Sequence, residues 1–347
     1  MDQGDAGFMK WIWRIALTLV AVLVIAFVIF RTPDTEAVEM RAKYGGAPSQ
    51  FVHVEESAGE GQIFHVRDVG PRDAPVIVLL HGSNSDLHTW DDWTERLKDS
   101  YRVISFDQVG HGLTGPDPDD SYSRATYTED IRALTRRLEV REFFLGGNSM
   151  GGKHALAFAA AYPEMVRGLI LVDASGGPVT RKPDEDDSGN IGFTIARTPI
   201  LNSIAEQITP RSLIKESLLQ SVSKKEVVTD EMIDRYWELL RYPGNRRATM
   251  KRFASDYDPL GEGEIAGITA PTLIIWGDED RLIPLSAGQW LDKTMPNSEL
   301  VVFEGVGHLP QKEIADETVA TVRQWLSRLQ ADNEAAEDSA STGTNPS

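Results

Sequence analysis

The first long apolar stretch of the chain covers residues 11–30, and only Arg14 and Thr18 interrupt it. A helix of about 20 apolar residues spans the roughly 30 Å hydrocarbon layer of a membrane. Arg14 lies near the start of the stretch, where its long side chain can reach the membrane interface. We therefore predict a single-pass transmembrane anchor at 11–30, preceded by a short N-terminal tail at 1–10.

A cleaved signal peptide and a buried core helix are the alternatives to an anchor. The apolar run from Ile15 to Phe30 exceeds the usual 7–15-residue core of a signal peptide, and no A-x-A cleavage site follows it. A core helix is a poor fit at the very terminus, ahead of a polar segment. Basic residues flank both ends, so charge hardly decides orientation. The short N-terminal tail favours a cytoplasmic N-terminus, which would place the rest of the chain outside the cytoplasm, in the periplasm of a bacterium.

Beyond a polar linker at 31–50, short apolar runs alternate with helix-like segments. Several of the runs are continuously apolar, as expected for parallel strands that are covered on both faces. They lie at residues 76–82, 101–108, 142–149, 168–175, 272–280 and 299–308. Two earlier runs, QFVHVEE and GQIFHVRD, alternate in polarity and predict an antiparallel hairpin at one edge. The alternation of strands and helices predicts an α/β fold with a mostly parallel sheet.

One interval lacks strand-like runs and divides the predicted core. Residues 176–262 contain helical patterns set among loops, which predicts a helical cap inserted into the sheet domain. The core would then consist of residues 51–175 and 263–330. The last segment, 331–347, contains four acidic residues and no large apolar group, so we expect an acidic disordered tail.

Composition narrows the classes of partner and chemistry. The 347 residues carry a formal net charge of −18, which argues against nucleic-acid binding because that needs a basic face. The chain has no cysteine, so disulfides, thiolate metal sites and cysteine nucleophiles are excluded. Hydrophobic residues make up 41% of the chain, which is enough for a full-sized core.

The sequence GNSMGG at 147–152 follows one apolar run and precedes an alanine-rich helical segment. This is the G-x-S-x-G pattern in the strand-then-helix setting where a sharp turn exposes a serine hydroxyl. We predict Ser149 as a nucleophile; a serine in an ordinary tight turn is the alternative. A free hydroxyl is a weak nucleophile and needs a base. His308 is our candidate, because it ends the last apolar run in a glycine-containing loop.

A catalytic histidine needs a carboxylate to orient it. Asp280 lies three residues beyond Gly277, where the loop should turn inward, and is our candidate. We expect Asp278 to stabilise the turn and Glu279 to face solvent. Asp173, at the end of another run, is the alternative acid.

Stabilising an oxyanion requires two backbone donors. The N–H of Met150, directly after the nucleophile, would supply one, and the N–H of Ser83 in the first strand–helix loop the other. We expect His81 to hold that loop through hydrogen bonds, and Asn84 to contact either the loop or the substrate.

In this order, the motifs resemble those of the α/β-hydrolase superfamily over about residues 51–330. The matching segments are HGSN at 81–84, DQVGHGLTG at 107–115, GNSMGG at 147–152, WGDEDRLIP at 276–284 and GVGHLP at 305–310. The resemblance implies an eight-stranded, mostly parallel sheet with a helical cap after the sixth strand, and no cofactor. It also implies a structural role for His111.

The resemblance leaves the substrate open. Haloalkane dehalogenases and epoxide hydrolases of this superfamily carry aspartate at the turn, so Ser149 argues against both. Our main expectation is hydrolysis of a small or medium apolar ester or lactone. One alternative is cleavage of a carbon–carbon bond in ring-fission products, whose hydrolases have similar turns but commonly carry tryptophan where this chain has Leu309. Another is a non-catalytic ligand-binding protein on the same fold. Four apolar cap residues either line an acyl pocket or pack the cap: Ile191, Phe193, Ile195 and Trp237.

Overall fold

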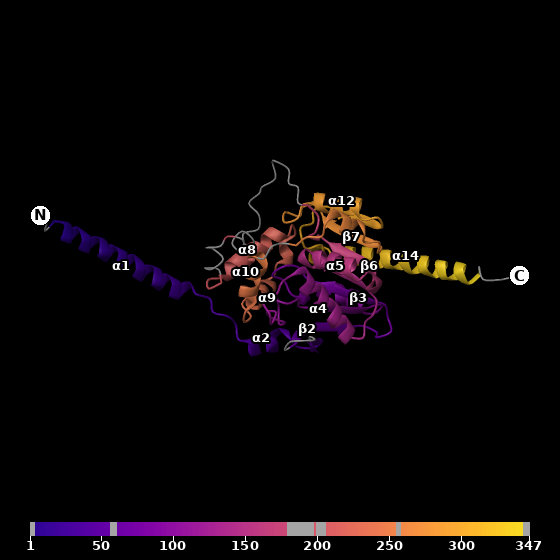
Figure 1. The fold of residues 1–347 in the computed structure, drawn as a ribbon, viewed down its shortest axis with the longest axis horizontal. Coiled ribbons are helices and arrows are strands. Elements are labelled where there is room, and N and C mark those ends of the chain that lie inside the picture. The colour runs from indigo at the N-terminus through magenta and orange to yellow at the C-terminus, as the bar shows by residue number, and fades with distance from the viewer. Residues whose placement is uncertain (1–3, 56–60, 179–197, 199–205, 255–257, 343–347) are drawn as a thin grey trace.

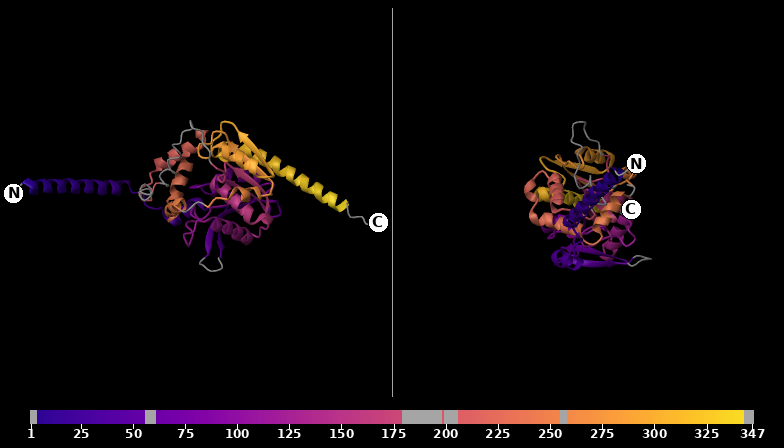
Figure 2. Two further views of the ribbon diagram at one scale, coloured as in Figure 1. Left: turned by 45° about the horizontal axis from the view of Figure 1, so that its top comes forward. Right: turned by 90° about the vertical axis from the view of Figure 1, so that its left-hand side faces the viewer.

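The computed structural model describes residues 4–55, 61–178, 198, 206–254 and 258–342 of the chain. An α/β core carries a cap beside it, and two long helices project from opposite sides (Figure 1). The N-terminal helix α1 (Gly4–Phe30) includes an exposed apolar stretch, Met9–Phe30, that is long enough to cross a membrane. Figure 2 shows that α1 leaves the domain on the side of the cap, whereas the C-terminal helix leaves on the far side.

Eight strands form one sheet in the order β1-β2-β4-β3-β5-β6-β7-β8. Strand β2 pairs antiparallel with β1 and β4, and the remaining neighbours pair in parallel. This arrangement confirms the predicted edge hairpin and the mostly parallel sheet. The strands are β1 (Ser49–Val54), β2 (Gln62–Val69), β3 (Val76–Leu80), β4 (Arg102–Phe106), β5 (Phe143–Asn148), β6 (Val166–Val172), β7 (Thr272–Gly277) and β8 (Ser298–Phe303).

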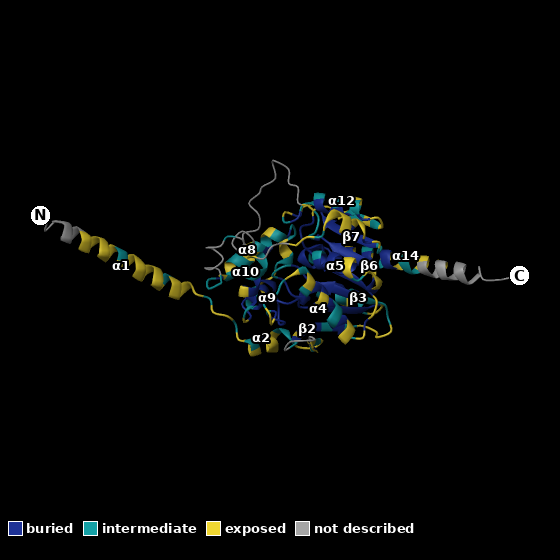
Figure 3. Cartoon of the chain, viewed as in Figure 1, coloured by how far each residue is buried: buried dark blue, intermediate teal, exposed yellow. Residues whose placement is uncertain are grey.

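Helices cover both faces of the sheet, and the central strands are buried (Figure 3). Within β3, Val78 and Leu80 join the apolar cluster on one face, whereas Ile77 and Leu79 join the cluster on the other. The first face is covered by α4 (Arg124–Arg137), α5 (Met150–Ala161), α11 (Glu262–Ala266) and α12 (Leu285–Thr294). The second is covered by the 3₁₀ turn Leu87–Trp90, α3 (Asp91–Leu97) and α14 (Ala315–Thr342). Short helical turns complete the core at Pro163–Met165 and at α13 (Pro310–Glu313).

Between β6 and β7 the chain forms the helical cap. It comprises α8 (Arg211–Ser221), a 3₁₀ turn (Lys225–Val227), α9 (Asp230–Leu240) and α10 (Asn245–Ala254). Leu218, Met232 and Ile233 pack with Leu309 of the core, so the cap rests on the loop that follows β8. Three of the proposed cap residues, Ile191, Phe193 and Ile195, lie outside the described residues.

Two segments are more ordered than the sequence suggested. The linker at 31–50 contains helix α2 (Ala37–Tyr44), and its Met40 is buried against Leu239 and Tyr242 of the cap. The expected disorder from residue 331 is wrong as far as Thr342, because α14 continues to that residue. Alanine and glutamate favour helix, and extending an existing helix avoids the cost of a new nucleus.

Candidate active site

The turn between β5 and α5 places Ser149 in a strained conformation, with φ 54° and ψ −117°. Such a conformation persists only where the surroundings impose it, and it often marks a functional position. Glycines on both sides make the turn possible. A Cβ on Gly147 would lie 2.3 Å from the carbonyl carbon of Gly151, and one on Gly151 would lie 2.2 Å from the carbonyl oxygen of Leu80. The predicted sharp turn is therefore present, and positions 147 and 151 have no room for a side chain.

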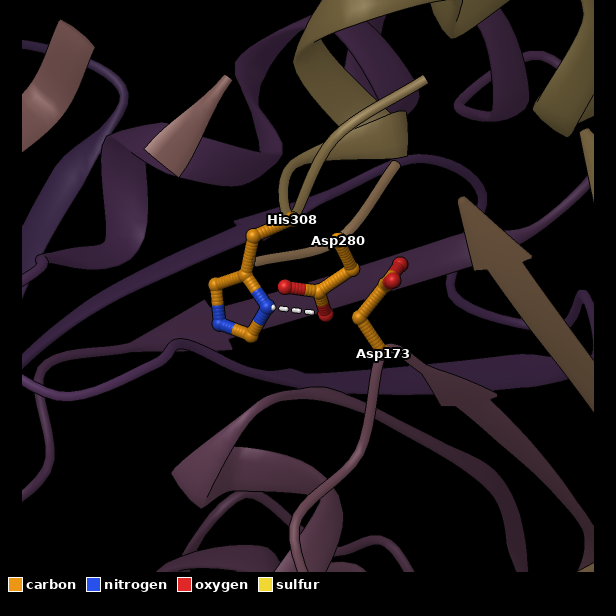
Figure 4. A group of neighbouring side chains, drawn as sticks. All are labelled: Asp173, Asp280 and His308. Carbon is orange, nitrogen blue, oxygen red and sulfur yellow. Dashed lines mark hydrogen bonds and ion pairs between the residues drawn. The ribbon is translucent and has the colours of Figure 1, made fainter. Parts of the chain in front are cut away.

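His308 and Asp280 form a buried hydrogen-bonded pair after β8 and β7. Nδ1 of His308 lies 2.7 Å from Oδ2 of Asp280, and a dashed line marks this bond in Figure 4. The other carboxylate oxygen, Oδ1, accepts hydrogen bonds from the amides of Leu282 at 2.8 Å and Ile283 at 3.0 Å. With a carboxylate as its partner, Nδ1 carries the proton, which leaves Nε2 as a lone-pair acceptor.

The other acids of the loop after β7 have different surroundings. Asp278 is exposed, and its Oδ1 accepts a hydrogen bond from the amide of Gly305 at 2.8 Å, so it joins this loop to the loop that carries His308. Glu279 is exposed. Both positions agree with the expected division of roles, in which Asp280 alone of the three acids contacts the imidazole.

Asp173, the alternative acid, lies behind Asp280 and does not contact the imidazole (Figure 4). It is fully buried, and its Oδ1 accepts a hydrogen bond from the amide of Gly277 at 3.1 Å. Burial, and then the neighbouring carboxylate of Asp280, raise the pKa of Asp173 well above its usual value. Ligand atoms of Asp173, Asp280 and His308 lie within 4.8 Å of one another. The raised pKa favours the protonated form of Asp173, which reduces the repulsion between the two neighbouring carboxyl groups.

A cavity between core and cap contains both Ser149 and His308. It encloses about 1000 Å³ that is partly open to solvent. Its apolar lining comprises Leu213, Ile214, Leu218, Leu240, Met250, Leu282 and Leu309. Its polar lining includes Ser83, Asn84, Ser85, Asn148, Thr209, Ser217, Ser221, Tyr236, Arg246 and Thr249. Although more of the lining residues are polar than apolar, most of the exposed wall is apolar, which is the usual form of a small-molecule site.

Trp237 of α9 packs the cap. Its Nε1 donates to the carbonyl of Thr209 at 2.7 Å, and the guanidinium of Arg241 lies 3.6 Å from the centre of its ring. Trp237 is also absent from the described lining of the cavity. Of the two roles considered for this residue, the structure favours packing.

The predicted oxyanion donors belong to segments next to Ser149. Met150 is the first residue of α5, so its amide belongs to the free N-terminal turn of the helix. Ser83 follows Gly82, where an added Cβ would lie 3.3 Å from Cβ of Ser149. Asn84 also lines the cavity, and its side-chain oxygen accepts a hydrogen bond from Thr249 of the cap.

His81 holds the loop that carries Ser83. Its Nδ1 lies 2.7 Å from the carbonyl of Gly82, and its Nε2 accepts from the amide of Gln108 at 3.0 Å. Burial lowers the pKa of His81. Burial and the nearby Arg252 guanidinium also hold the pKa of His111 well below its usual value. The lowered pKa favours the neutral form of both imidazoles, and the hydrogen bonds of His81 agree with the loop-holding role expected of it.

Sequence reasoning missed two residues that support His308. Asn148 Nδ2 donates to the carbonyls of Val172 and His308, each at 3.1 Å. The buried carboxylate of Glu313 accepts from the amide of Gly307 at 3.0 Å and, on the cap, from those of Ser223 and Lys224 at 2.9 Å. The position of Glu313, five residues beyond His308 at the end of the short helix α13, was the available signal.

Comparison with known proteins identifies the family. The family model described as "alpha/beta hydrolase fold" matches residues 75–314. The chain belongs to the α/β-hydrolase family. It is 30% identical over 284 residues to a 2-hydroxy-6-oxononadienedioate/2-hydroxy-6-oxononatrienedioate hydrolase of Paraburkholderia xenovorans (strain LB400). The alignment covers 80% of this chain and 95% of that protein.

Two solved structures show how far the likeness of this α/β hydrolase extends. A meta-cleavage product hydrolase from Pseudomonas fluorescens IP01 is 25% identical, with a TM-score of 0.67 over 82% of this chain and 98% of that chain. A bacterial membrane phospholipase A is 22% identical, with a TM-score of 0.69 over 94% and 99%. The second likeness concerns the fold alone. The family makes this chain a hydrolase, and the named relatives favour carbon–carbon cleavage over our main expectation of an ester substrate.

Proposed function

We propose that the protein is a serine hydrolase that cleaves a bond next to a carbonyl group, with Ser149 as nucleophile, His308 as base and Asp280 as the acid that orients it. The observation that carries the proposal is the buried His308–Asp280 pair, which opens into the same cavity as the strained Ser149. The pair fixes the tautomer in which Nε2 can accept a proton, as a general base must.

The reaction follows from these roles. Ser149 Oγ attacks the substrate carbonyl while His308 Nε2 takes the hydroxyl proton. The amides of Met150 and Ser83 hold the oxyanion. When the tetrahedral intermediate collapses, the bond to the leaving group breaks, and the proton on Nε2 passes to that group. Water then attacks the acyl-enzyme and gives a proton to His308. When this second intermediate collapses, the bond to Ser149 Oγ breaks, His308 returns the proton to that oxygen, and the acid is released.

The leading candidate for the bond is a carbon–carbon bond in a ring-fission product. The relatives named for hydrolases of 2-hydroxy-6-oxononadienedioate match this chain over most of its length, which supports this candidate. The leaving group would then be a carbon stabilised as an enolate, and the proton from His308 would be delivered to that carbon.

Hydrolysis of an apolar ester or lactone is the second candidate. It is favoured by the apolar wall of the cavity and by Leu309, which packs with the cap beside His308. An acyl chain would gain roughly 0.8 kcal/mol for each methylene buried there.

Parallel assays would separate the two candidates. The purified full chain, in detergent micelles, is given ring-fission products and p-nitrophenyl esters of increasing acyl length, and kcat/KM is compared. A higher kcat/KM for the ring-fission products supports carbon–carbon cleavage, and a preference for esters of medium length supports the second candidate. Loss of neither activity in Ser149→Ala would contradict the shared mechanism.

We also propose that α1 anchors the enzyme in a membrane as a single-pass helix, with the hydrolase domain outside the cytoplasm. The unburied apolar surface of Met9–Phe30 supports an anchor. Membrane-pelleting of the full chain, with protease protection in spheroplasts, tests both the attachment and the side on which the domain lies.

A further inference from the structure

The segment that joins α1 to the core is bound to the cap. The amide of Thr32 donates to the carbonyl of Gln207, and that of Thr35 to the carbonyl of Arg241, each at 2.9 Å. Further along, Lys43 and Tyr44 both contact the carboxylate of Glu238 at 2.6 Å. These bonds are made at several points along the segment. The juxtamembrane segment, residues 32–44, is therefore an outer layer of the cap.

This layer reaches the substrate cavity through Arg246 of α10. Arg246 is 5% exposed. Among the described residues that line the cavity, no other is a lysine or an arginine. Its Nη1 donates to the carbonyl of Thr32 at 2.9 Å, and its Nη2 to Oδ1 of Asp34 at 2.6 Å. Thr32 Oγ1 also accepts from the amide of Thr209, another lining residue, at 2.7 Å.

The charge of the cavity wall consequently depends on a residue outside the hydrolase domain. A buried guanidinium attracts anions, and a carboxylate bonded to it cancels much of that field. The side chain of Asp34 is 47% exposed on the outer side of the arginine, so replacing it should leave packing nearly intact. Removal of Asp34 would leave the positive charge of Arg246 acting on the cavity without its counter-ion.

We propose that the juxtamembrane segment is a specificity element of the hydrolase site, in which Asp34 offsets Arg246 and weakens selection for substrates with an anionic tail. The proposal rests on the proposed function only through the reactivity of Ser149. It applies equally to an ester and to a ring-fission product, because it concerns the charge of the tail and not the bond that is cleaved.

Two fluorophosphonates of equal chain length test the proposal, one ending in a methyl group and one in a carboxylate. The rate constants for labelling Ser149 are measured on the full chain in detergent micelles, and their ratio is compared among variants. Asp34→Asn should raise the carboxylate-to-methyl ratio roughly five- to tenfold. Glu39→Gln, which removes an exposed acid from the same segment, is the matched control and should change the ratio less than about twofold.

A double variant tests whether Asp34 acts through Arg246. In Asp34→Asn with Arg246→Gln, the ratio should fall back to the wild-type value or below it, because the uncompensated charge is gone. Should that variant misfold, the Asp34→Asn ratio still decides. An unchanged ratio in Asp34→Asn overturns this inference alone, whereas failure of both probes to label native protein overturns the proposed function with it.

Discussion

The turn at Ser149 and the wall formed by the cap differ in how they are built. The turn is fixed by contacts between neighbouring strands and a helix, where glycines leave no room for another geometry. The cap wall instead brings together Arg246 and Asp34, which are 212 residues apart, through side-chain bonds. From this comparison we infer that the rigid sheet edge sets reactivity, and that segments outside the family motifs set selectivity.

The largest expected effect is on the rigid side of the comparison. Ser149→Ala should lower kcat by about 10⁴–10⁶-fold, because the nucleophile and its base act as a unit. The matched control is Ser83→Ala in the same cavity, which keeps the backbone N–H and should retain most activity. Steady-state kinetics with whichever substrate is turned over measure both. Comparable losses in the two variants would contradict the assigned roles.

Asp280→Asn should lower kcat by about 10³–10⁴-fold, because an amide no longer holds the imidazole in the tautomer that accepts a proton at Nε2. The side chain of Asp278, in the same loop, is hydrogen-bonded only to the amide of Gly305 among the described contacts. Asp278→Asn should therefore lower kcat less than about tenfold. The kcat ratio of the two variants checks the choice between neighbouring acids. Equal losses of kcat would contradict the assignment of the orienting role to Asp280 and would point to disruption of the whole loop.

Ser149 and Asp280 could both be proposed from the sequence. Both proposals depend on local backbone geometry: the strand-then-helix setting of GNSMGG and the spacing of Asp280 beyond Gly277. A motif and the hydrophobic periodicity around it were therefore enough to make them. The contacts of Glu313 and Arg246 could not be predicted, because each joins segments that are far apart in the sequence and meet only when the cap packs on the core. Helix α2 in the linker could not be predicted for the same reason, because the mixed polarity of residues 31–50 conceals Met40, which is buried against Leu113 of the core and against the cap.

Glu313→Gln sharpens the comparison at the point where the two regions meet. Both carboxylate oxygens of Glu313 accept hydrogen bonds from backbone N–H groups, one set in the His308 loop and the other in the cap. A glutamine would replace one of these oxygens with an NH₂ group, which cannot accept, so one set of bonds would be lost. We expect kcat to fall about 10–100-fold with a smaller change in KM, and the melting temperature to fall as well. Glu317→Gln, at an exposed position of α14, is the control, with kcat expected to stay within about twofold of the wild type. A change confined to melting temperature would limit Glu313 to a structural role.

The smallest effect concerns Asp173 and pH. Because the pKa of Asp173 is raised on folding, the stability linked to its protonated form is present at low pH and is lost as pH rises through the folded-state pKa. Asp173→Asn stays neutral, so its melting temperature should decline less than that of the wild type as pH rises from about 4, the ordinary pKa of an aspartate, toward the raised folded-state pKa. Thermal unfolding across pH measures the difference. Parallel curves for the two proteins would show that Asp173 is already ionised in the folded state.

The most direct test of the central claim is the site at which an alkyl fluorophosphonate reacts, determined by intact mass and peptide mapping of native protein. We predict one adduct, on Ser149, formed at a rate that His308→Gln lowers by at least about 10³-fold. No adduct on the native wild type, or an adduct on Ser149 that forms equally fast in His308→Gln, would contradict the claim that this imidazole makes this hydroxyl reactive.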